Sequence, residues 1–579
     1  MIKKKNKKSS SKKMMNVNIN RRISVVIAFL VLCFSVIVVK AFTIQIKGKE
    51  FYTKQGDKRQ IRDVEIFVPR GTIYDRNGEP LAISSPMISI GINPSVMVDN
   101  LTDVAKLAEK LGLDAEDLKN QVVNKKHKKF VYIQRRIPPY DAQAVRSLGL
   151  AGVEFRQEFK RFYPAAEITS QLIGFTDAND VGKEGIERLY NGWLAGNKGK
   201  KQVMQDRIGN IIKDVKEIIP AKKGQDIELS IDRRLQYIAY KALKTAVYHH
   251  NASKGAAVII DVNTGEILAM VSQPFYNPNN ITKESINGMR NRATEDVYEP
   301  GSVIKPFTVI AGMLSGKYDE SSVIDTTPGR LEVDGSTFRD ARNYGEINLA
   351  TLLAKSSNVG AAKIALNIEK SILWDTLNIF GFGKRTIEKM RFESTGSLPD
   401  YHSWSKTRRG NIAFGYGLQV TTLQLANAYA AIANKGRIRE PSYLKQKGNL
   451  NSDKAIIDPA IALAVKNMLV GVVSEHNTGH NAMIEGYKVA GKTGTARMSF
   501  NGGYADKYIA SFVGFAPADN PKIVVAVSIT DAKGDDFSGG VVAAPVFKQI
   551  MQNSLRLLNI SPTEDSSNTA KLNKEEANG

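Results

Sequence analysis

Cysteine is almost absent from the chain, which has a single one, Cys33, among 579 residues. A lone cysteine excludes a disulfide framework within the chain, and Cys33 lies in an apolar run where no catalytic thiol or metal site is expected. Histidine is also scarce, with six residues in total. His476 and His480 are four residues apart, but Asn477 and Gly479 disfavour the helix that a metal site with this spacing needs. We therefore expect no metal site.

Acidic residues are outnumbered by basic ones, 58 to 81, which gives a formal net charge of +23. Nine of the basic residues fall within residues 1–22, which contain no acid, and the remaining excess is spread along the chain. This spread is typical of a generally basic surface and does not indicate a nucleic-acid-binding face. With 42% hydrophobic residues and only 20 prolines, the chain can bury large cores, and its length predicts two or three domains.

Long apolar runs are missing except for one near the N-terminus. Residues 23–39 are all apolar or small, and a short continuation follows Lys40 up to residue 44. The run reaches the ~20 residues that cross a bilayer, is too long for a cleaved signal peptide, and has no A-x-A-like site after it. We expect a transmembrane helix at 23–44 after a basic cytoplasmic tail at 1–22. The positive-inside rule places residues 47–579 on the opposite side.

The rest of the chain divides at residues 222–224, where Lys-Lys-Gly marks a shift in composition. Before this point, residues 47–225 have short apolar runs between turn signals. Residues 68–82 predict a strand, a turn and a strand, and the apolar spacing between residues 101 and 150 predicts helices. Residues 226–560 predict one larger unit, and the polar residues 561–579 predict a disordered tail.

Two predicted hairpins in the larger unit indicate an antiparallel sheet. Strands are expected at 256–262 and 266–272 around Asn263-Thr264-Gly265, and at 508–516 and 522–530 around a second turn. A further strand is expected at 227–232, and amphipathic helices at 233–248 and 546–560. The predicted fold class is therefore α+β, with an antiparallel sheet flanked by helices.

The first candidate catalytic string is EPGSVIKP at residues 299–306. Pro306 is tolerated only near a helix start, so Ser302 should lie in the first turn with Lys305 on the same face. A desolvated, partly neutral lysine can act as the base for a serine nucleophile, and the helix start favours developing negative charge. Any one such pair alone is better explained as a solvated helix face. The same Ser-x-x-Lys spacing also occurs at Ser9, Ser10, Ser403 and Ser442.

The second candidate string is Ser356-Ser357-Asn358. The hydroxyl of Ser356 and the amide of Asn358 are two residues apart, and such groups can relay a proton and hold a substrate carbonyl. A helix cap or a loop is the alternative interpretation, because Ser-x-Asn also occurs at three other places in the chain.

The third candidate string, Lys492-Thr493-Gly494-Thr495, occurs once and has strand-forming neighbours. Lys492 offers a point charge to a carboxylate, and Gly494 would let a ligand lie close to the backbone. An ordinary edge strand is the alternative for the string alone. Residues 486–493 also fit G-x-x-x-x-G-K-[ST], but nothing after Thr493 opens a helix, so we reject a phosphate-binding loop.

In this order, the three strings resemble those of penicillin-binding proteins and β-lactamases. The chain resembles the class B penicillin-binding proteins over almost its full length beyond the membrane segment, and no stretch resembles a glycosyltransferase module. The resemblance implies a serine β-lactamase-like transpeptidase (penicillin-binding) domain at 226–560, preceded by a pedestal (dimerisation-type) domain at 47–225. Further matching stretches are residues 68–82, RFYP at 161–164, EGIERLY at 184–190, DRIGNII at 206–212, and residues 261–270 and 272–280.

For catalysis, the resemblance implies that Ser302 attacks the D-Ala-D-Ala carbonyl of a peptidoglycan stem peptide and forms an acyl-enzyme. Lys305 would accept the serine proton, Ser356 would pass a proton to the leaving amine, and Asn358 would hold the donor peptide. An amine from a second stem peptide would then take the acyl group. β-Lactams would be trapped on Ser302, and no metal or organic cofactor is implied.

For substrate binding, the resemblance implies that Lys492, Thr493 and Thr495, with Gly494 between them, bind the terminal carboxylate. The backbone amides of Ser302 and Thr495 would form the oxyanion hole. A class A β-lactamase is disfavoured because no glutamate between the second and third strings has Asn four residues later. A non-catalytic β-lactam sensor or scaffold is the alternative from another class, and the complete set of side chains and the short cytoplasmic tail disfavour it.

Residues 272–280, 298–301 and 414–434 resemble the division-specific, septal type of this family, with the elongation type as the alternative. This resemblance implies a serine-type D-Ala-D-Ala transpeptidase with carboxypeptidase-type chemistry, single-pass in the inner membrane, with a cytoplasmic N-terminus and a periplasmic body at the division septum. The implied partners are a septal glycan polymerase and other divisome membrane proteins, and no nucleic acid.

Overall fold

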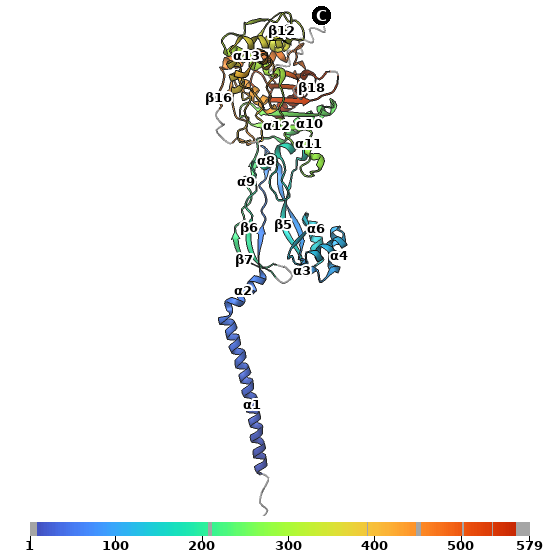
Figure 1. Ribbon diagram of the computed structural model, residues 1–579, viewed down its shortest axis with the longest axis vertical. Coiled ribbons are helices and arrows are strands. Elements are labelled where there is room, and N and C mark those ends of the chain that lie inside the picture. The colour runs from blue at the N-terminus through green and yellow to red at the C-terminus, as the bar shows by residue number, and fades with distance from the viewer. Residues whose placement is uncertain are drawn as a thin grey trace, which may run out of the picture. The chain divides into compact units, whose positions relative to one another are not determined.

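The computed structural model describes residues 9–205, 211–390, 392–446, 453–500, 503–534 and 536–562. Most of the tail expected at 561–579 and most of the 206–212 string lie outside the described residues. The chain forms two compact units, whose elements are labelled in Figure 1. The smaller unit comprises residues 1–68, 86–159 and 197–222, and the larger one comprises 69–85, 160–196 and 223–579. Segments 69–85 and 160–196, expected in the pedestal, therefore pack as part of the larger unit.

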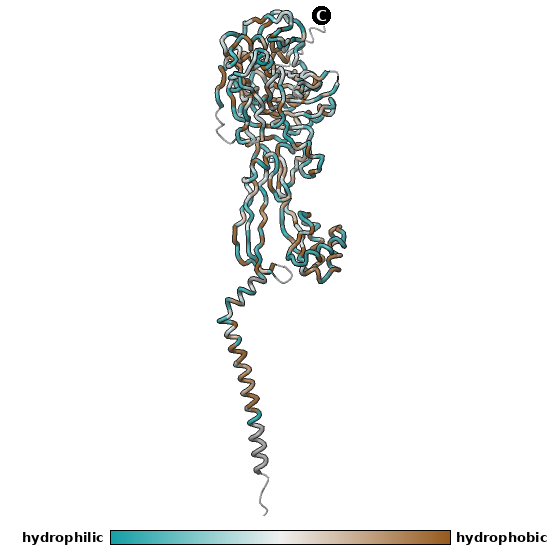
Figure 2. The backbone as a smooth tube through the Cα atoms, viewed as in Figure 1, coloured by the Kyte–Doolittle hydropathy of each residue, from teal (hydrophilic) through white to brown (hydrophobic). Residues whose placement is uncertain are grey.

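One long helix opens the smaller unit. Helix α1 (Ser9–Phe42) continues into a π-helical turn (Thr43–Lys47) and is followed by α2 (Lys49–Gln60). Residues Arg21–Lys47 are the one helix in the described part of the chain that is long and apolar enough to cross a membrane, with a mean hydropathy of 2.9 over an 18-residue stretch (Figure 2). The large apolar side chains of this helix are exposed, as a lipid-facing surface requires.

The smaller unit has two further parts. One is an antiparallel three-stranded sheet in the order β1 (Ile61–Ile66), β6 (Gly199–Gln205), β7 (Ile211–Ile219). The other packs helices on residues 86–92 of β3 (Pro80–Ile92), on β4 (Val131–Ile137) and on residues 153–159 of β5 (Val153–Phe162). The helices are α3 (Pro94–Met97), α4 (Leu101–Leu111), α5 (Ala115–Asn124) and α6 (Pro139–Arg146).

Strand β4 corrects the expectation of helices throughout residues 101–150. The segment VYIQRRI is rich in β-branched and aromatic residues, which favour a strand, and it pairs antiparallel with residues 88–92 of β3. The helical periodicity of α4 and α5 therefore ends at Asn124 and resumes only at Pro139.

The core of the larger unit is an antiparallel five-stranded sheet in the order β10–β9–β19–β18–β17. Both predicted hairpins are confirmed, because β9 pairs with β10 and β18 pairs with β19. The strand expected at 227–232 is shorter than predicted, because Asp232 already caps the next helix by accepting the N–H of Arg234. Only β8 (Ile227–Glu228) remains, and it pairs with β2 (Ile73–Tyr74). The sheet strands are β9 (Lys254–Asp261), β10 (Ile267–Gln273), β17 (Ala490–Phe500), β18 (Gly503–Ala516) and β19 (Ile523–Thr530).

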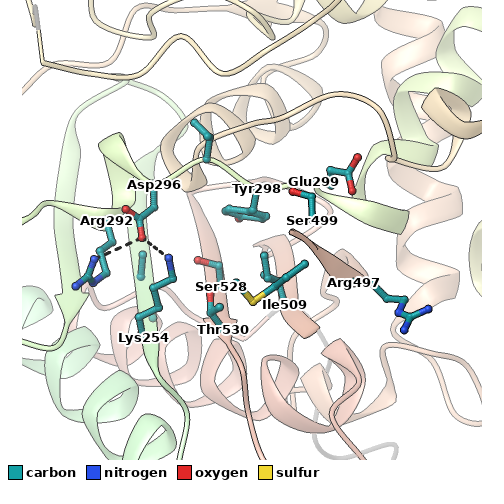
Figure 3. A pocket seen from close by; sticks show the side chains of 14 residues that line it. Lys254, Arg292, Asp296, Tyr298, Glu299, Arg497, Ser499, Ile509, Ser528 and Thr530 are labelled. Atoms are coloured by element: carbon teal, nitrogen blue, oxygen red, sulfur yellow. Dashed lines mark hydrogen bonds and ion pairs between the residues drawn. The ribbon is translucent and has the colours of Figure 1, made fainter. Parts of the chain in front are cut away.

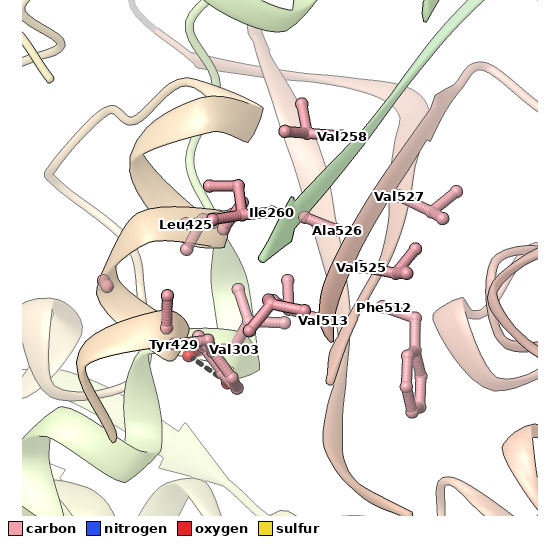
Figure 4. Close-up of a cluster of buried hydrophobic side chains, with 14 of the residues drawn as sticks. Val258, Ile260, Val303, Leu425, Tyr429, Phe512, Val513, Val525, Ala526 and Val527 are labelled. Carbon is pink, nitrogen blue, oxygen red and sulfur yellow. Dashed lines mark hydrogen bonds between the residues drawn. The ribbon is translucent and has the colours of Figure 1, made fainter. Parts of the chain in front are cut away.

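Helices cover both faces of this sheet, which confirms the α+β class. Helices α10 (Arg233–His249) and α21 (Ala544–Leu557) lie on one face, where Phe512 packs against Phe547 with ring centroids 4.5 Å apart. Helix α18 (Thr422–Ala433) lies on the other face, and Figure 4 shows Val513 pointing toward it. Because both faces are covered, β10 and β19 are buried at every position, which explains why their sequences are predominantly apolar.

The elements that carry the candidate site residues pack beside this sheet. They are α13 (Lys305–Leu314), α14 (Leu349–Lys355), α15 (Asn358–Asn367) and the hairpin of β12 (Arg330–Val333) and β13 (Ser336–Arg339). The remaining helices and strands are α7 (Ser170–Ile173), α8 (Gly185–Leu189), α9 (Asn191–Leu194), α11 (Ile286–Met289), α12 (Arg292–Glu295), α16 (Lys370–Ile379), α17 (Lys406–Ala413), α19 (Pro459–Val472), α20 (Gly539–Val542), β11 (Val323–Asp325), β14 (Glu346–Asn348), β15 (Arg437–Ile438) and β16 (Lys454–Ala455).

Candidate active site

Ser302 lies in a 3₁₀ turn, η4 (Gly301–Ile304), that leads directly into α13. Pro306 is at the start of that helix, so the predicted position of Ser302 in the first turn is confirmed. The Ser302 side chain is half-buried. A Cβ on Gly301 would lie 3.0 Å from the carbonyl oxygen of Thr495, so the turn packs directly against β17, which carries the third string.

Lys305 is fully buried, and its Nζ donates to three acceptors in the second string. These are the backbone carbonyl of Ser356, the Ser356 Oγ at 3.1 Å and the Asn358 Oδ1 at 2.7 Å. In the described part of the chain no hydrogen bond joins Lys305 to Ser302. Their spacing of three places both on one side of the helix start, and catalytic hydrogen bonds often tighten only when substrate binds.

Lys492 is fully buried on β17 and approaches the same serine from the sheet. Its Nζ lies 3.1 Å from Ser356 Oγ and 3.3 Å from both the carbonyl and the hydroxyl oxygen of Thr493. The hydroxyl of Ser356 therefore joins all three strings, which are separated by up to 190 positions from Ser302 to Lys492 in the sequence.

Burial changes the proton affinity of both lysines. It lowers the pKa of Lys305 well below its usual range, the nearby Lys492 lowers it further, and Asp340 opposes the shift. Burial also lowers the pKa of Lys492 to about 7. A lysine with a lowered pKa can be neutral near pH 7, and a neutral amine is what a serine nucleophile needs as its base.

The turn between α14 and α15 presents the second string to the lysines. Ser356 has a left-handed backbone with φ of 59°, while the Oγ of Ser357 caps α15 by accepting the N–H of Gly360 at 2.9 Å. The helix-cap interpretation is therefore correct for Ser357. Its neighbours Ser356 and Asn358 instead point toward Lys305, so the cap and the polar cluster come from alternate residues of one turn.

Asp340 holds this turn, and the sequence analysis did not single it out. Its Oδ2 accepts the hydroxyl of Ser357 at 2.6 Å, and its Oδ1 accepts the N–H groups of Asn358 at 2.5 Å and Val359 at 3.0 Å. The Nδ2 of Asn358 donates to the carbonyl of Arg339 at 2.9 Å. Arg339 and Asp340 lie 16 or more residues before the turn, and no spacing rule connects such a pair to it.

The third string occupies the edge strand of the five-stranded sheet, as its alternative interpretation predicted. Gly494 also has a structural reason to lack a side chain. A Cβ on Gly494 would lie 2.4 Å from the Ser511 hydroxyl and 2.8 Å from the Pro300 carbonyl. Its absence lets the η4 turn pack on the strand. Because η4 carries the candidate nucleophile Ser302, we call it the nucleophile turn. The Oγ1 of Thr495 accepts the N–H of Gly539, the first residue of α20, at 2.9 Å.

Two more residues that the sequence analysis missed support the nucleophile turn. The N–H of Gly301 donates to the carbonyl of Gly415 at 3.1 Å, and a Cβ on Gly415 would lie 2.0 Å from the Gly301 oxygen. The buried hydroxyl of Tyr429 on α18 donates to the Val303 carbonyl at 2.8 Å, the dashed line in Figure 4. Both contacts fix the turn through backbone groups, which sequence patterns do not reveal.

The other sequence patterns considered for a site lie in different settings from the three strings. Lys492 lies inside β17, so the residues that fit the phosphate-loop pattern do not open a helix, and the rejection of that loop is confirmed. In the other Ser-x-x-Lys pairs of the larger unit, Lys406 is exposed and Lys445 is paired with Glu228. His476 has φ of 59° and stands outside any helix, as expected.

A separate cavity of about 100 Å³ lies on the same sheet but away from these groups (Figure 3). Its lining includes Tyr298 and Glu299, just before the nucleophile turn, and the ion pair of Lys254 with Asp296 at 2.8 Å. None of the predicted site residues lines it.

A half-buried serine at a helix start and two buried lysines that share a serine hydroxyl are the groups that serine acyl transfer requires. Two family models match this chain. The model described as "Penicillin binding protein transpeptidase domain" matches residues 255–552, and "Penicillin-binding Protein dimerisation domain" matches residues 65–229. The chain belongs to the class B penicillin-binding proteins.

Individual relatives match over nearly their whole length. The probable peptidoglycan D,D-transpeptidase PbpC of Pseudomonas aeruginosa is 41% identical over 94% of this chain and 96% of its own. The peptidoglycan D,D-transpeptidase FtsI of Escherichia coli is 37% identical over 95% and 96%. Among solved structures, a peptidoglycan synthetase from Bifidobacterium adolescentis has a TM-score of 0.70 at 25% identity, covering 87% of this chain and 98% of its own. The transpeptidase domain of Burkholderia pseudomallei penicillin-binding protein 3 has a TM-score of 0.54 at 37% identity, covering 58% and 98%.

Proposed function

We propose that this chain is a peptidoglycan D,D-transpeptidase that cross-links stem peptides through an acyl-enzyme on Ser302. One observation carries the proposal. The hydroxyl of Ser356 lies 3.1 Å from the Nζ atoms of both buried lysines, Lys305 and Lys492, beside the turn that holds Ser302. This arrangement provides a nucleophile, a base with a lowered pKa and a hydroxyl that can carry a proton between them.

In the acylation step, the Ser302 Oγ attacks the carbonyl carbon between the two D-alanines and its proton passes to neutral Lys305. The oxyanion that forms is held by the backbone N–H groups of Ser302 and Thr495. Removing one such donor typically costs about 3–4 kcal/mol of transition-state stabilisation. The close packing of Gly301 on the Thr495 carbonyl brings the two backbone segments together, which supports this pairing.

In the second half of the reaction, Ser356 passes a proton to the leaving nitrogen, the amide bond breaks and the terminal D-Ala departs. The acyl group remains on Ser302 as an ester. The amine of a second stem peptide then attacks this ester, and the serine regains its proton. Asn358 holds the donor peptide, and Lys492, Thr493 and Thr495 bind the carboxylate that marks the D-Ala-D-Ala end. A β-lactam opens on Ser302 by the same attack, but its leaving nitrogen stays attached.

The experiment that tests this function uses the full chain in detergent with a D-Ala-D-Ala pentapeptide donor and an amine acceptor. We expect D-Ala release together with a cross-linked product, and neither from Ser302→Ala. Ser403→Ala is the matched control, because Ser403 and Lys406 repeat the same spacing on an exposed segment. Release of D-Ala without cross-linked product would assign the chain to carboxypeptidase chemistry. Penicillin binding without any turnover would favour the sensor or scaffold.

The membrane anchor and the cellular role belong to the same proposal. The apolar helix at Arg21–Lys47 supports a single-pass inner-membrane protein, and the basic residues before it support a cytoplasmic N-terminus and a periplasmic body. A reporter that is active only in the periplasm should be active when fused after residue 60. An inactive fusion would reverse the proposed topology.

For the cellular role, we favour the division septum over elongation, with a septal glycan polymerase and other divisome membrane proteins as partners. The support is the resemblance of residues 272–280, 298–301 and 414–434 to the septal type. Depleting the protein should block septation while elongation continues, which gives long filaments. Rounded, swelling cells would favour the elongation type, and normal division would contradict both roles.

A further inference from the structure

Asp340 lies outside the three strings, yet its carboxylate is bonded to three consecutive residues of the second one. It accepts the side-chain hydroxyl of Ser357 and the backbone N–H groups of Asn358 and Val359, at 2.5 to 3.0 Å. Three hydrogen bonds to one carboxylate at the start of α15 fix the direction in which that helix begins. The residue just before this helix is Ser357, and the one before that is Ser356.

The neighbouring carbonyl of Arg339 fixes the orientation of the Asn358 amide. Because the Nδ2 of Asn358 donates to Arg339, its Oδ1 is the atom that faces the Lys305 Nζ, at 2.7 Å. A flipped amide would place two donors against each other. The pair at 339–340 therefore determines which atoms of the second string meet Lys305.

The hairpin that carries this pair is itself held in place. The ring of Phe338 packs edge-to-face on Phe414 with centroids 5.4 Å apart, and a Cβ on Gly410 would lie 2.4 Å from the Phe338 ring. At the other strand, the Thr407 hydroxyl donates to the Val333 carbonyl at 3.1 Å. The hairpin thus rests on α17 and the segment after it, and Asp340 is presented from a fixed support.

We propose that Asp340 is a positioning residue for the transfer reaction, which holds Ser356 and Asn358 in the geometry in which they bind Lys305. This role rests on the proposed function. Asp340 touches no reacting atom and acts through the turn. Substitution of Asp340 should therefore weaken acylation of Ser302 without removing the nucleophile or the base.

The charge of Asp340 gives this role a measurable signature. Two charged groups act on Lys305: Lys492 on β17 disfavours its proton, and Asp340 at the end of β13 favours it. Acylation requires neutral Lys305, so its rate should rise with pH through the pKa of that lysine. Loss of the Asp340 charge lowers this pKa, so the midpoint of the rate profile should move to lower pH.

The test measures the second-order rate constant of acylation by a fluorescent penicillin against pH, using the full chain in detergent. For Asp340→Asn we expect a plateau roughly tenfold lower, because small misplacements of a positioned group cost one to two orders of magnitude. We also expect the midpoint to fall by about half a pH unit or more. The matched control is Asp334→Asn, in the exposed turn of the same hairpin, where φ of 46° suits asparagine equally well.

The outcomes separate the alternatives. A wild-type rate and midpoint in Asp340→Asn would overturn the proposal, as would an equal shift in Asp334→Asn or a loss of rate with no shift. If Asp340→Asn does not fold, Ser357→Ala decides, because it removes the hydroxyl contact to Asp340, together with the cap on Gly360, and keeps the Asp340 charge. This variant should lower the plateau several-fold with an unchanged midpoint, and a wild-type plateau would contradict the role. A wild-type protein that never labels would instead contradict the proposed function.

Discussion

Lys305 and Lys492 share one hydrogen-bond partner, since the Nζ atom of each lies 3.1 Å from the hydroxyl oxygen of Ser356. Both side chains are fully buried, so two ammonium charges that share this partner would repel each other with little screening by water. One proton between the two amines is more favourable than two, and Ser356 lies where it can pass that proton across. The titration of either lysine is therefore a property of the pair.

Removal of the proposed base should stop acylation without unfolding the protein. Lys305→Met keeps most of the side-chain volume but cannot take the proton of Ser302. General-base catalysis contributes roughly 10²–10⁴-fold, so the acylation rate constant should fall by about that factor. Stopped-flow mixing with a fluorescent penicillin measures it. Lys317→Met, an exposed lysine just after α13, is the control and should acylate normally, and a near wild-type rate in Lys305→Met would exclude the base role.

Lys492 should weaken the fold at neutral pH. Its pKa is lowered from 10.5 to about 7 in the folded chain, so between these values the unfolded chain binds the proton more tightly. The resulting cost is absent above pH 10.5, grows as the pH falls, and is complete below about pH 7.

Lys492→Met should therefore be inactive but more stable at pH 7, by on the order of a few kcal/mol, with the gain shrinking as the pH approaches 10. Thermal unfolding at several pH values measures this difference. Lys488→Met is the control at an exposed lysine on the same segment, and it should leave the Tm unchanged. A lower Tm for Lys492→Met at pH 7 would show that the buried charge is compensated in the folded protein.

The nucleophile turn should not tolerate a side chain at Gly415. A Cβ there would lie 2.0 Å from the Gly301 carbonyl, and backbone atoms cannot move aside as a flexible side chain can. Gly415→Ala should therefore lower the Tm by several degrees and lower the penicillin acylation rate. Gly417→Ala separates the clash from backbone strain, because φ is also positive there but the nearest atom to its Cβ is 3.7 Å away. Equal effects of the two substitutions would attribute the loss to strain alone.

Much of the larger unit could be predicted from the sequence, because its sheet is built from hairpins whose turns are short and recognisable. The strands at 256–262 and 508–516 are predominantly apolar segments next to turn residues, and the structure places them in adjacent hairpins. Strand β4 was missed because its seven residues lie between helices and show no clear alternation. Local patterns predict local pairing, whereas β4 is determined by its partner β3.

The candidate site was likewise predicted only in part from the sequence. Ser302, Ser356 and Lys492 were predicted because their spacing resembles a known set of strings, and the structure brings the three strings together around Ser356. Asp340 and Gly415 act through backbone groups of the turns that hold these residues. Their contribution depends on which loops meet in space, and a single sequence carries no record of that.

Mass spectrometry of the penicillin-treated protein identifies the acylated residue, which we expect to be Ser302. Digestion of the labelled chain should give one modified peptide, with the opened β-lactam on Ser302 and unmodified Ser356 and Ser403. Ser302→Ala should give no modified peptide at an unchanged Tm. A β-lactam adduct on any other residue, or labelling that persists in Ser302→Ala, would show that Ser302 is not the nucleophile.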